Sequence, residues 1–248
     1  MNNLAGKIIN HDGAFFGEIN FEKQIQNIKR IEDPNTQNYI IPGFIDLHCH
    51  GGNGYDTMEG LDSIKRMSEY HLSNGTTTLL ATTWTSTLDH TYTALKNFNN
   101  LINLNTNLIG VHLEGPFINP NKLGAQPPLT QPPSKEFIEK TKSLAEIKII
   151  TLAPEISGMD NFITFLNDNK IKVQFGHSLA KYNCCKEYMD KFNIGFTHLY
   201  NAMSGNDHRN PGVLSAALLN AKYAEIICDL NHVSIESIKI AKKCIPKL

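Results

Sequence analysis

Six residues whose side chains suit metal binding fall where short apolar runs of the sequence end. They are His48, His50, His112, Glu114, His177 and His198. On an extended chain, residues two apart share a face, so His48 and His50 can point at one centre while Cys49 points away. Neutral imidazoles with one carboxylate, leaving a position for water, are the usual ligands of a hydrolytic Zn²⁺ or a related divalent ion. The pattern predicts a metal site that activates water.

Each of these residues also has a structural interpretation. A His-x-His pair at a strand end can simply be solvated or hydrogen-bonded. Glu114 before Gly-Pro can cap a turn, and His177 before Ser178 can cap a helix. Three separate predicted strands, however, bring His or Glu to the same rim of a predicted barrel, where folds of this class place their sites. This coincidence favours metal binding.

The elements that must position these residues follow a repeating pattern. Short apolar and β-branched runs alternate with amphipathic segments, which is typical of βα units around a parallel sheet. The predicted strands are 40–47, 76–82, 107–113, 147–152, 171–175, 194–198 and 223–228. The predicted helices are 60–73, 87–102, 135–145, 159–168, 181–191, 212–221 and 234–243, with Ser134, Asp160 and Ser234 as helix starts. We therefore expect an α/β fold, a TIM-type (β/α)8 hydrolase barrel that is incomplete, with about seven βα units.

Residues 1–40 differ from the rest. They alternate apolar pairs with polar and turn-forming residues, which predicts antiparallel strands with one solvated face. We expect 1–40 to form part of a small β-sandwich domain and 41–248 to form the barrel without its last unit. The Pro-rich segment 115–134 is too long for a plain connection, and loops of that length are usually functional or disordered.

Composition limits the functional classes. The 248 residues carry a net charge of -1 and no long run of Lys or Arg, so we expect neither nucleic acid nor an anionic membrane surface as a partner. No apolar run is long enough for a membrane span or a secretion signal, which makes the cytoplasm the expected location. The five cysteines are odd in number and irregularly spaced, so we expect reduced thiols.

A second group of residues suits an anionic or polyhydroxylated ligand. Segments 198–203 and 206–212 supply amide, guanidinium and glycine groups. Arg209 could bind a phosphate or carboxylate through two hydrogen bonds, or it could be a surface residue of a mobile loop. His232 precedes a predicted helix whose N-terminus favours an anion, or it could be a core-facing loop histidine.

Seven segments together resemble the N-acetylglucosamine-6-phosphate deacetylase family of the amidohydrolase superfamily. They are PGFIDLHCHGG (42–52), GTTT (75–78), GVHLEGPFINPNKLGAQ (110–126), TLAPE (151–155), GHS (176–178), THLYNAM (197–203) and DLNHV (229–233). HLEGP and THLYNAM are specific, whereas GHS alone is weak. The resemblance spans about residues 40 to 248.

The resemblance implies that Glu114, His177 and His198 hold the principal metal ion and that His48 and His50 can hold a second. Zn²⁺ is the ion expected, with iron, cobalt and manganese as alternatives. The sugar-phosphate site is implied to be lined by Ala125, Gln126, Asn201, Ala202, Arg209 and His232, with the last two near the phosphate. A homodimer is implied to complete this pocket.

The implied reaction is hydrolysis of the acetamide of N-acetylglucosamine 6-phosphate to glucosamine 6-phosphate and acetate, with a carboxylate passing the proton of the water to the amine. Many family members carry His at the position of Gln126, which can still donate a hydrogen bond but offers no charge. The proton-shuttling Asp of the family belongs to an eighth strand beyond Leu248, so we assign no catalytic acid or base. Asp229 is expected to brace His232 instead.

Two alternatives stay open at this point. The chain could be a shortened relative that binds metal and sugar phosphate without turnover. It could also be a different amidohydrolase, such as a cyclic amidase or deaminase; those relatives commonly place a carbamylated lysine or another histidine where Glu114 stands, and HLEGP argues against them.

Overall fold

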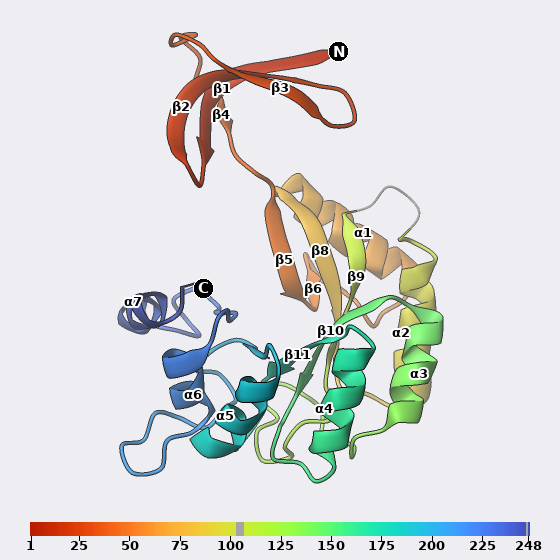
Figure 1. Ribbon diagram of the computed structural model, residues 1–248. Coiled ribbons are helices and arrows are strands. Elements are labelled where there is room, and N and C mark those ends of the chain that lie inside the picture. Colours follow the sequence, from red (N-terminus) through yellow and green to blue (C-terminus); the bar gives the residue numbers. More distant parts are fainter. Residues whose placement is uncertain (103–106, 247) are drawn as a thin grey trace. The chain divides into compact units, whose positions relative to one another are not determined.

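The computed structural model describes residues 1–102, 107–246 and 248 (Figure 1). The chain divides into two compact units, Met1–Ile45 and Asp46–Leu248. Every residue of the predicted metal site belongs to the second unit. Within the described ranges, no helix combines the length and the apolar character that crossing a membrane requires.

The first unit is a four-stranded sheet in the order β3-β2-β1-β4. Its strands are β1 (Asn2–Asn10), β2 (Gly13–Phe21), β3 (Ile25–Arg30) and β4 (Tyr39–Ile40). The pairs β1–β2 and β2–β3 are antiparallel, which confirms the predicted antiparallel strands, whereas β4 runs parallel to β1. Alternation along the strands buries Ile8 and Ile19 and leaves their neighbours more exposed, as expected for a sheet with one solvated face.

The second unit is built on a six-stranded sheet in the order β12-β11-β10-β9-β8-β5, a curled parallel half-barrel (Figure 1). Its strands are β5 (Phe44–Cys49), β8 (Thr76–Thr83), β9 (Leu108–Glu114), β10 (Ile147–Leu152), β11 (Lys172–Phe175) and β12 (Gly195–Phe196). A short hairpin of β6 (Gly51–Gly52) and β7 (Tyr55–Asp56) follows β5. Because spatial order follows chain order, the carboxyl ends of all six strands meet at one rim.

The second unit contains seven helices among the described residues. They are α1 (Leu61–Ser73), α2 (Leu88–Asn99), α3 (Lys135–Leu144), α4 (Met159–Asp168), α5 (Tyr182–Lys191), α6 (Val213–Asn220) and α7 (Ile235–Cys244). Ser134 and Ser234 cap α3 and α7 by accepting a backbone N–H three residues on, as predicted. The prediction that Asp160 starts a helix is wrong. α4 begins at Met159 after Gly158. Asp160 lies in its first turn, where its negative charge interacts favourably with the helix dipole.

The core of the second unit lies between the helices and the sheet. α1 and α2 pack on β8, and α4 packs on β11. Met67 of α1, Phe98 of α2 and Leu79 of β8 are fully buried, and so are Ile163 of α4 and Phe175 of β11. Large apolar side chains therefore fix the strands, and the polar residues at the strand ends remain free to form a site.

The predicted strand 223–228 is wrong. The segment is extended, and Glu225 donates its N–H to the Phe196 carbonyl and accepts from the Leu199 N–H. Two backbone hydrogen bonds beside the two-residue strand β12 are too few for a ladder. The segment 223–228 therefore pairs only briefly beside β12 and does not form a further strand of the sheet.

Candidate metal centre

Glu114 is the centre of the site. It is the last residue of β9 and only 2% exposed. Its Oε1 lies 3.1 Å from His177 Nε2, 3.0 Å from His198 Nε2 and 3.3 Å from His48 Nε2. Its Oε2 lies 3.0 Å from His50 Nε2. One buried carboxylate therefore brings together four imidazoles, and every one of them presents its Nε2 atom.

The strand ends explain this convergence. His48 and His50 alternate along the chain at the end of β5, and Cys49 between them is buried on the opposite face. His177 and His198 follow β11 and β12 with φ angles of 49° and 30°, a left-handed conformation that costs a non-glycine residue on the order of 1 kcal/mol or more. The tertiary structure around these two histidines maintains that strain where their side chains turn toward Glu114.

The long loop 115–134 is anchored over the site. Phe117 and Ile118 are fully buried, and the Phe117 carbonyl accepts the N–H of Ala153. Gln126, which is 4% exposed, accepts the Thr85 N–H and donates to Glu114 Oε2. The loop therefore brings the Gln126 amide to the buried carboxylate.

In the His177 and His48 rings, the hydrogen bond made by Nδ1 determines that the lone pair lies on Nε2. His177 Nδ1 lies 2.8 Å from the Lys122 carbonyl, which can only accept, so Nδ1 carries the proton. His48 Nδ1 lies 2.9 Å from Glu225 Oε2 and donates in the same way. In the neutral rings, both Nε2 atoms then direct lone pairs at a carboxylate oxygen of Glu114. Acceptors that face one another at about 3 Å need a proton or a metal ion between them, and this set of ligand atoms suits a divalent metal ion.

The remaining ring atoms support the same interpretation. His177 Nε2 and His198 Nε2 lie 3.0 Å apart, and His48 Nε2 and His50 Nε2 lie 3.1 Å apart. Among the described residues, the buried Nδ1 atoms of His50 and His198 have no hydrogen-bond partner. Buried polar atoms are normally satisfied. Metal ions bound between them would satisfy four ring nitrogens packed this closely.

The electrostatics of the metal-free cluster are strongly perturbed. Burial raises the pKa of Glu114, but hydrogen bonds from His177, His198, His48 and His50 outweigh it and hold that pKa well below its usual range. Burial lowers the pKa of His48, but Glu114 and Glu225 outweigh it and raise it to about 10. The cluster therefore keeps a carboxylate ionised in a buried position and attracts positive charge to it.

Three groups of residues have the spacing of metal ligands. They are Glu114 with His177 and His198, Glu114 with His48 and His50, and His48 with His112 and Glu225. In each group, one ligand atom per residue lies within 4.8 Å of the others. The first two groups share Glu114, so one carboxylate can bridge two ions.

His112 does not join the Glu114 cluster, contrary to its inclusion among the six candidate ligands. Its Nδ1 donates to the Leu47 carbonyl at 2.9 Å, and its Nε2 lies 2.7 Å from Thr151 Oγ1. Both ring nitrogens are therefore occupied, although the ring packs edge-on against His48 with 4.7 Å between centroids. The sequence pattern identified a histidine at the correct strand end but not its direction.

The predicted sugar-phosphate residues lie in several environments. Ala202 is half-buried, and Gly124 is placed so that an added Cβ would lie 3.5 Å from the Ala202 Cβ and from a ring carbon of His177. Asn201 is half-buried and donates to backbone carbonyls, and Ala125 is exposed. The loop of Ala125 and the segment of Asn201 and Ala202 therefore adjoin the metal centre.

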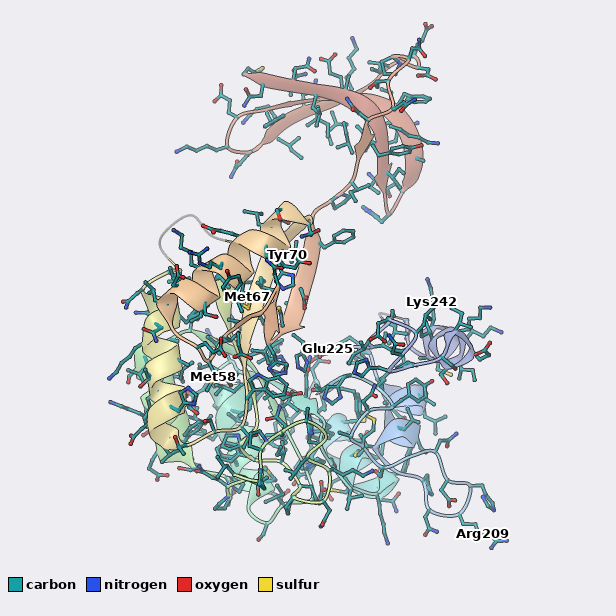
Figure 2. The ribbon with its side chains drawn as sticks, turned by 180° about the vertical axis from the view of Figure 1, so that it is seen from behind. Met58, Met67, Tyr70, Arg209, Glu225 and Lys242 are labelled. Atoms are coloured by element: carbon teal, nitrogen blue, oxygen red, sulfur yellow. The ribbon has the colours of Figure 1, made fainter. Side chains whose placement is uncertain are left out.

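Arg209 and His232 lie on the surface of this chain. Arg209 occupies an exposed loop, and Figure 2 shows it far from Glu225. His232 Nδ1 lies 2.7 Å from Asp229 Oδ2, and Asp229 Oδ1 accepts the His232 N–H, so Asp229 braces His232 as expected. Backbone and side-chain hydrogen bonds from His232 lower the pKa of Asp229 to about 2. Within this chain, neither Arg209 nor His232 joins the Glu114 cluster.

The sequence analysis did not identify three residues of the site, which are Glu225, Trp84 and Asp56. Glu225 pairs with His48, and Trp84 stacks on the His50 ring with 3.8 Å between centroids. The indole N–H of Trp84 donates to Asp56 Oδ2 at 2.9 Å. One signal could have found Glu225, since it is a charged residue inside the apolar run YAEIIC. Trp84, the only tryptophan in the sequence, directly follows a strand on the same rim.

Comparison with known proteins gives a consistent result. The amidohydrolase family profile matches residues 39–210. N-acetylglucosamine-6-phosphate deacetylase from Bacillus subtilis is 37% identical over 224 residues, which are 86% of this chain and 56% of that protein. N-acetylgalactosamine-6-phosphate deacetylase from Escherichia coli O157:H7 is 29% identical and aligns with 83% of this chain and 56% of its own length.

Solved structures are similar as well. The crystal structure of N-acetylglucosamine-6-phosphate deacetylase from Thermotoga maritima matches with a TM-score of 0.87 and 33% identity, covering 96% of this chain and 66% of that one. The chain thus spans a little over half the length of the curated relatives it matches.

Proposed function

Because the chain belongs to the amidohydrolase family, we propose that it acts in the metal-dependent hydrolysis of the acetamide of N-acetylglucosamine 6-phosphate. The observation that carries this proposal is the convergence of four imidazole Nε2 atoms on the buried carboxylate of Glu114. The names of the relatives support the substrate class, an N-acetylated hexosamine 6-phosphate.

We propose that Glu114, His177 and His198 hold the principal ion and that His48 and His50 hold a second with Glu114. Zn²⁺ is our proposed ion, because a set of imidazoles and one carboxylate suits it. When bound, such an ion supplies Lewis-acid polarisation of a carbonyl and lowers the pKa of a bound water from about 15.7 toward 7.

The protein residues have separate roles in this proposal. Gln126 is held against Glu114 and offers an amide that can orient the substrate carbonyl or the carboxylate. Glu114 remains a ligand rather than a base, since four histidines contact it. Among the described residues, the site carboxylates Glu114, Glu225 and Asp229 all face histidines, so we assign the proton transfer to none of them.

The phosphate contacts are proposed to come from Arg209 and His232, with Ala125, Asn201 and Ala202 lining the sugar. Arg209 and His232 are both exposed, which suits residues that serve a pocket completed by a second copy of the chain. We therefore propose a homodimer. Sedimentation equilibrium should give twice the chain mass, and a monomer at micromolar concentration would contradict this assignment.

The cytoplasm is our proposed location. The five cysteines of the chain are free thiols, as expected for a protein in a reducing compartment. Fractionation of the native cell with detection by a specific antibody tests this assignment, and recovery outside the cytoplasm would contradict it.

The decisive experiment measures acetate release from N-acetylglucosamine 6-phosphate after metal-stripped protein has been reconstituted with Zn²⁺. We expect acetate and glucosamine 6-phosphate in equal amounts, with much slower release from unphosphorylated N-acetylglucosamine. Glu114→Ala is the matched control because it removes the shared ligand. Zn²⁺-loaded protein that releases no more acetate than this control contradicts the proposal and favours the alternative of a binding protein, which calorimetric titration with the same sugar phosphate would identify.

A further inference from the structure

Glu225 is a carboxylate at the rim that neither metal group of Glu114 uses. It lies in the extended segment between α6 and α7, and its side chain is 20% exposed. Its backbone is fixed beside β12 by hydrogen bonds with Phe196 and Leu199. The side chain is therefore held in a defined position at the carboxyl end of the sheet.

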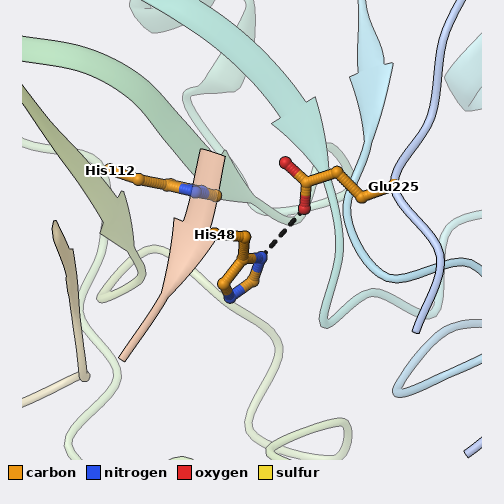
Figure 3. A group of neighbouring side chains, drawn as sticks. All are labelled: His48, His112 and Glu225. Carbon is orange, nitrogen blue, oxygen red and sulfur yellow. Dashed lines mark hydrogen bonds and ion pairs between the residues drawn. The ribbon is translucent and has the colours of Figure 1, made fainter. Parts of the chain in front are cut away.

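Both oxygens of Glu225 have specific partners. Oε2 lies 2.9 Å from His48 Nδ1, and Oε1 accepts from Gln174 Nε2 at 2.9 Å. Figure 3 shows the Glu225 carboxylate and the His48 ring pointing toward each other. Burial raises the pKa of Glu225, but the hydrogen bond and charge of His48 outweigh it, so that pKa is lowered and the group can only accept.

We propose that Glu225 is a positioning residue that fixes the His48 ring, so that Nε2 is presented to the second metal ion while Nδ1 keeps its proton. This inference rests on the two-ion site proposed above. A metal-binding histidine usually donates its other ring N–H to a carboxylate or a carbonyl, which fixes the tautomer and raises the basicity of the ligand atom. The Lys122 carbonyl has the same relation to His177.

A hydrogen-bonded network connects Glu225 back to the start of the site. Its members are polar residues at or beyond the ends of neighbouring strands: Gln174, Thr197, Thr151 and His112. The network closes on the Leu47 carbonyl, in the residue that precedes His48. Each contact between neighbours is 2.7 to 2.9 Å long. The carboxylate is therefore braced through several strands and cannot follow a mobile ring.

The same contacts argue against a third metal ion in the group of His48, His112 and Glu225. His112 directs both nitrogens at protein oxygens, and burial lowers its pKa to about 4, so the ring is neutral. His48 Nδ1 carries a proton toward Glu225 and has no lone pair to offer there. The group has the spacing of metal ligands, but both nitrogens of His112 are occupied and His48 Nδ1 carries a proton.

Trp84 provides a reporter that lies beside the ligands of the second ion. It is the only tryptophan of the sequence and stacks on the His50 ring, so Co²⁺ bound at His48 and His50 should quench its emission. The experiment titrates Co²⁺ into the metal-stripped protein of residues 1–248 and follows tryptophan fluorescence, while equilibrium dialysis counts the ions bound. For the wild type, we expect two equivalents, with most of the quenching coming from the ion at His48 and His50.

For Glu225→Gln, we expect the dissociation constant of the quenching step to rise about 10–100-fold, the range typical of such supporting residues. The ion held by His177 and His198 should bind as in the wild type, and the melting temperature should change little, because Gln keeps the volume and a carbonyl acceptor. In a His48→Ala background, Glu225→Gln should have no further effect on the quenching step, since the inferred action passes through His48. Asp229→Asn is the matched control, because Asp229 makes the same contact with Nδ1 of His232, outside the cluster.

An unchanged quenching constant in Glu225→Gln would overturn the inference and leave the proposed function intact. Equal weakening in the His48→Ala background would overturn it as well, since a purely structural role has that result. A wild-type protein that binds a single equivalent overturns the inference together with the second site, whereas acetate release on the first ion still tests the proposed function. Should Glu225→Gln fail to fold, Glu225→Asp keeps the charge but shortens the side chain, and an unchanged constant in that variant is also decisive against the inference.

Discussion

The two halves of the metal centre are held by different means. His177 and His198 follow β11 and β12, and the His177 ring is fixed by a backbone carbonyl. His48 lies on β5, the edge strand of the described sheet, and His50 directly follows it; their rings are fixed by the side chains of Glu225 and Trp84. The side chains of the first pair are 4% and 12% exposed, and those of the second pair are 15% and 19% exposed.

This difference indicates which ion is the more secure. A ligand fixed by the main chain keeps its orientation when neighbouring side chains change. A ligand fixed by side chains on an edge strand loses its orientation when one neighbour is replaced. We therefore expect the second ion to bind more weakly and to respond to substitutions that leave the first ion unaffected.

The largest effect is expected where the two halves meet. Glu114→Gln preserves the volume but removes the charge that both ion groups share, so both dissociation constants should rise more than ~100-fold. Inductively coupled plasma mass spectrometry of the protein after gel filtration measures the metal content that remains. Glu187→Gln, on the exposed surface of α5, is the control and should retain both ions. Retention of either ion by Glu114→Gln would contradict a shared carboxylate.

The next effect separates the halves. His177→Ala should remove the first ion and reduce acetate release by ~1,000-fold or more, whereas His48→Ala should weaken only the second ion, which keeps Glu114 and His50, and reduce release by ~10-fold. Cobalt titration with tryptophan emission measures which ion is affected, because the Trp84 ring stacks on His50, a ligand of the second ion. Loss of the ion held by His177 and His198 in His48→Ala would contradict the separation of the two halves.

Much of this arrangement could be predicted from the sequence. The apolar runs predicted six of the strands, and the order of βα units predicted a parallel sheet whose strand ends share a rim. His48, His50, Glu114, His177 and His198 were placed at that rim by position alone. Periodicity and the parallel connection rule suffice for this, because they depend on local sequence.

The remainder depends on tertiary distance. Glu225 lies 177 residues from His48, and nothing local connects them. The direction of His112 depends on Thr151 of a neighbouring strand, and the exposure of Arg209 depends on how its loop folds. Side-chain direction at a strand end is decided by partners on other strands, which a single sequence does not reveal.

A smaller effect is expected from the support of the first half. Glu155 accepts hydrogen bonds from Asn119, Ser178 and the Leu179 N–H, and so holds the loop that carries His177. Glu155→Gln places an amide N–H against these donors, which should cost ~1–3 kcal/mol and lower the melting temperature by roughly 2–12 °C. The first ion should bind a few-fold more weakly, and quenching of Trp84 by the second should be unchanged. Calorimetric unfolding and cobalt titration measure both, and a loss confined to the second ion would contradict this role.

The smallest effect is expected from the contact between Trp84 and His50, tested while Glu225 is unchanged. Trp84→Leu removes the ring stacked on His50, a contact of about 0.5–1.5 kcal/mol, so the second ion should bind roughly 2–10-fold more weakly. Trp84→Phe retains an aromatic face but loses the hydrogen bond to Asp56, so it should lie between Leu and the wild type. Equilibrium dialysis with Co²⁺ measures this without the fluorophore. If Trp84→Leu weakens both ions equally, the indole stabilises the whole rim, and His50 is not held separately from His177.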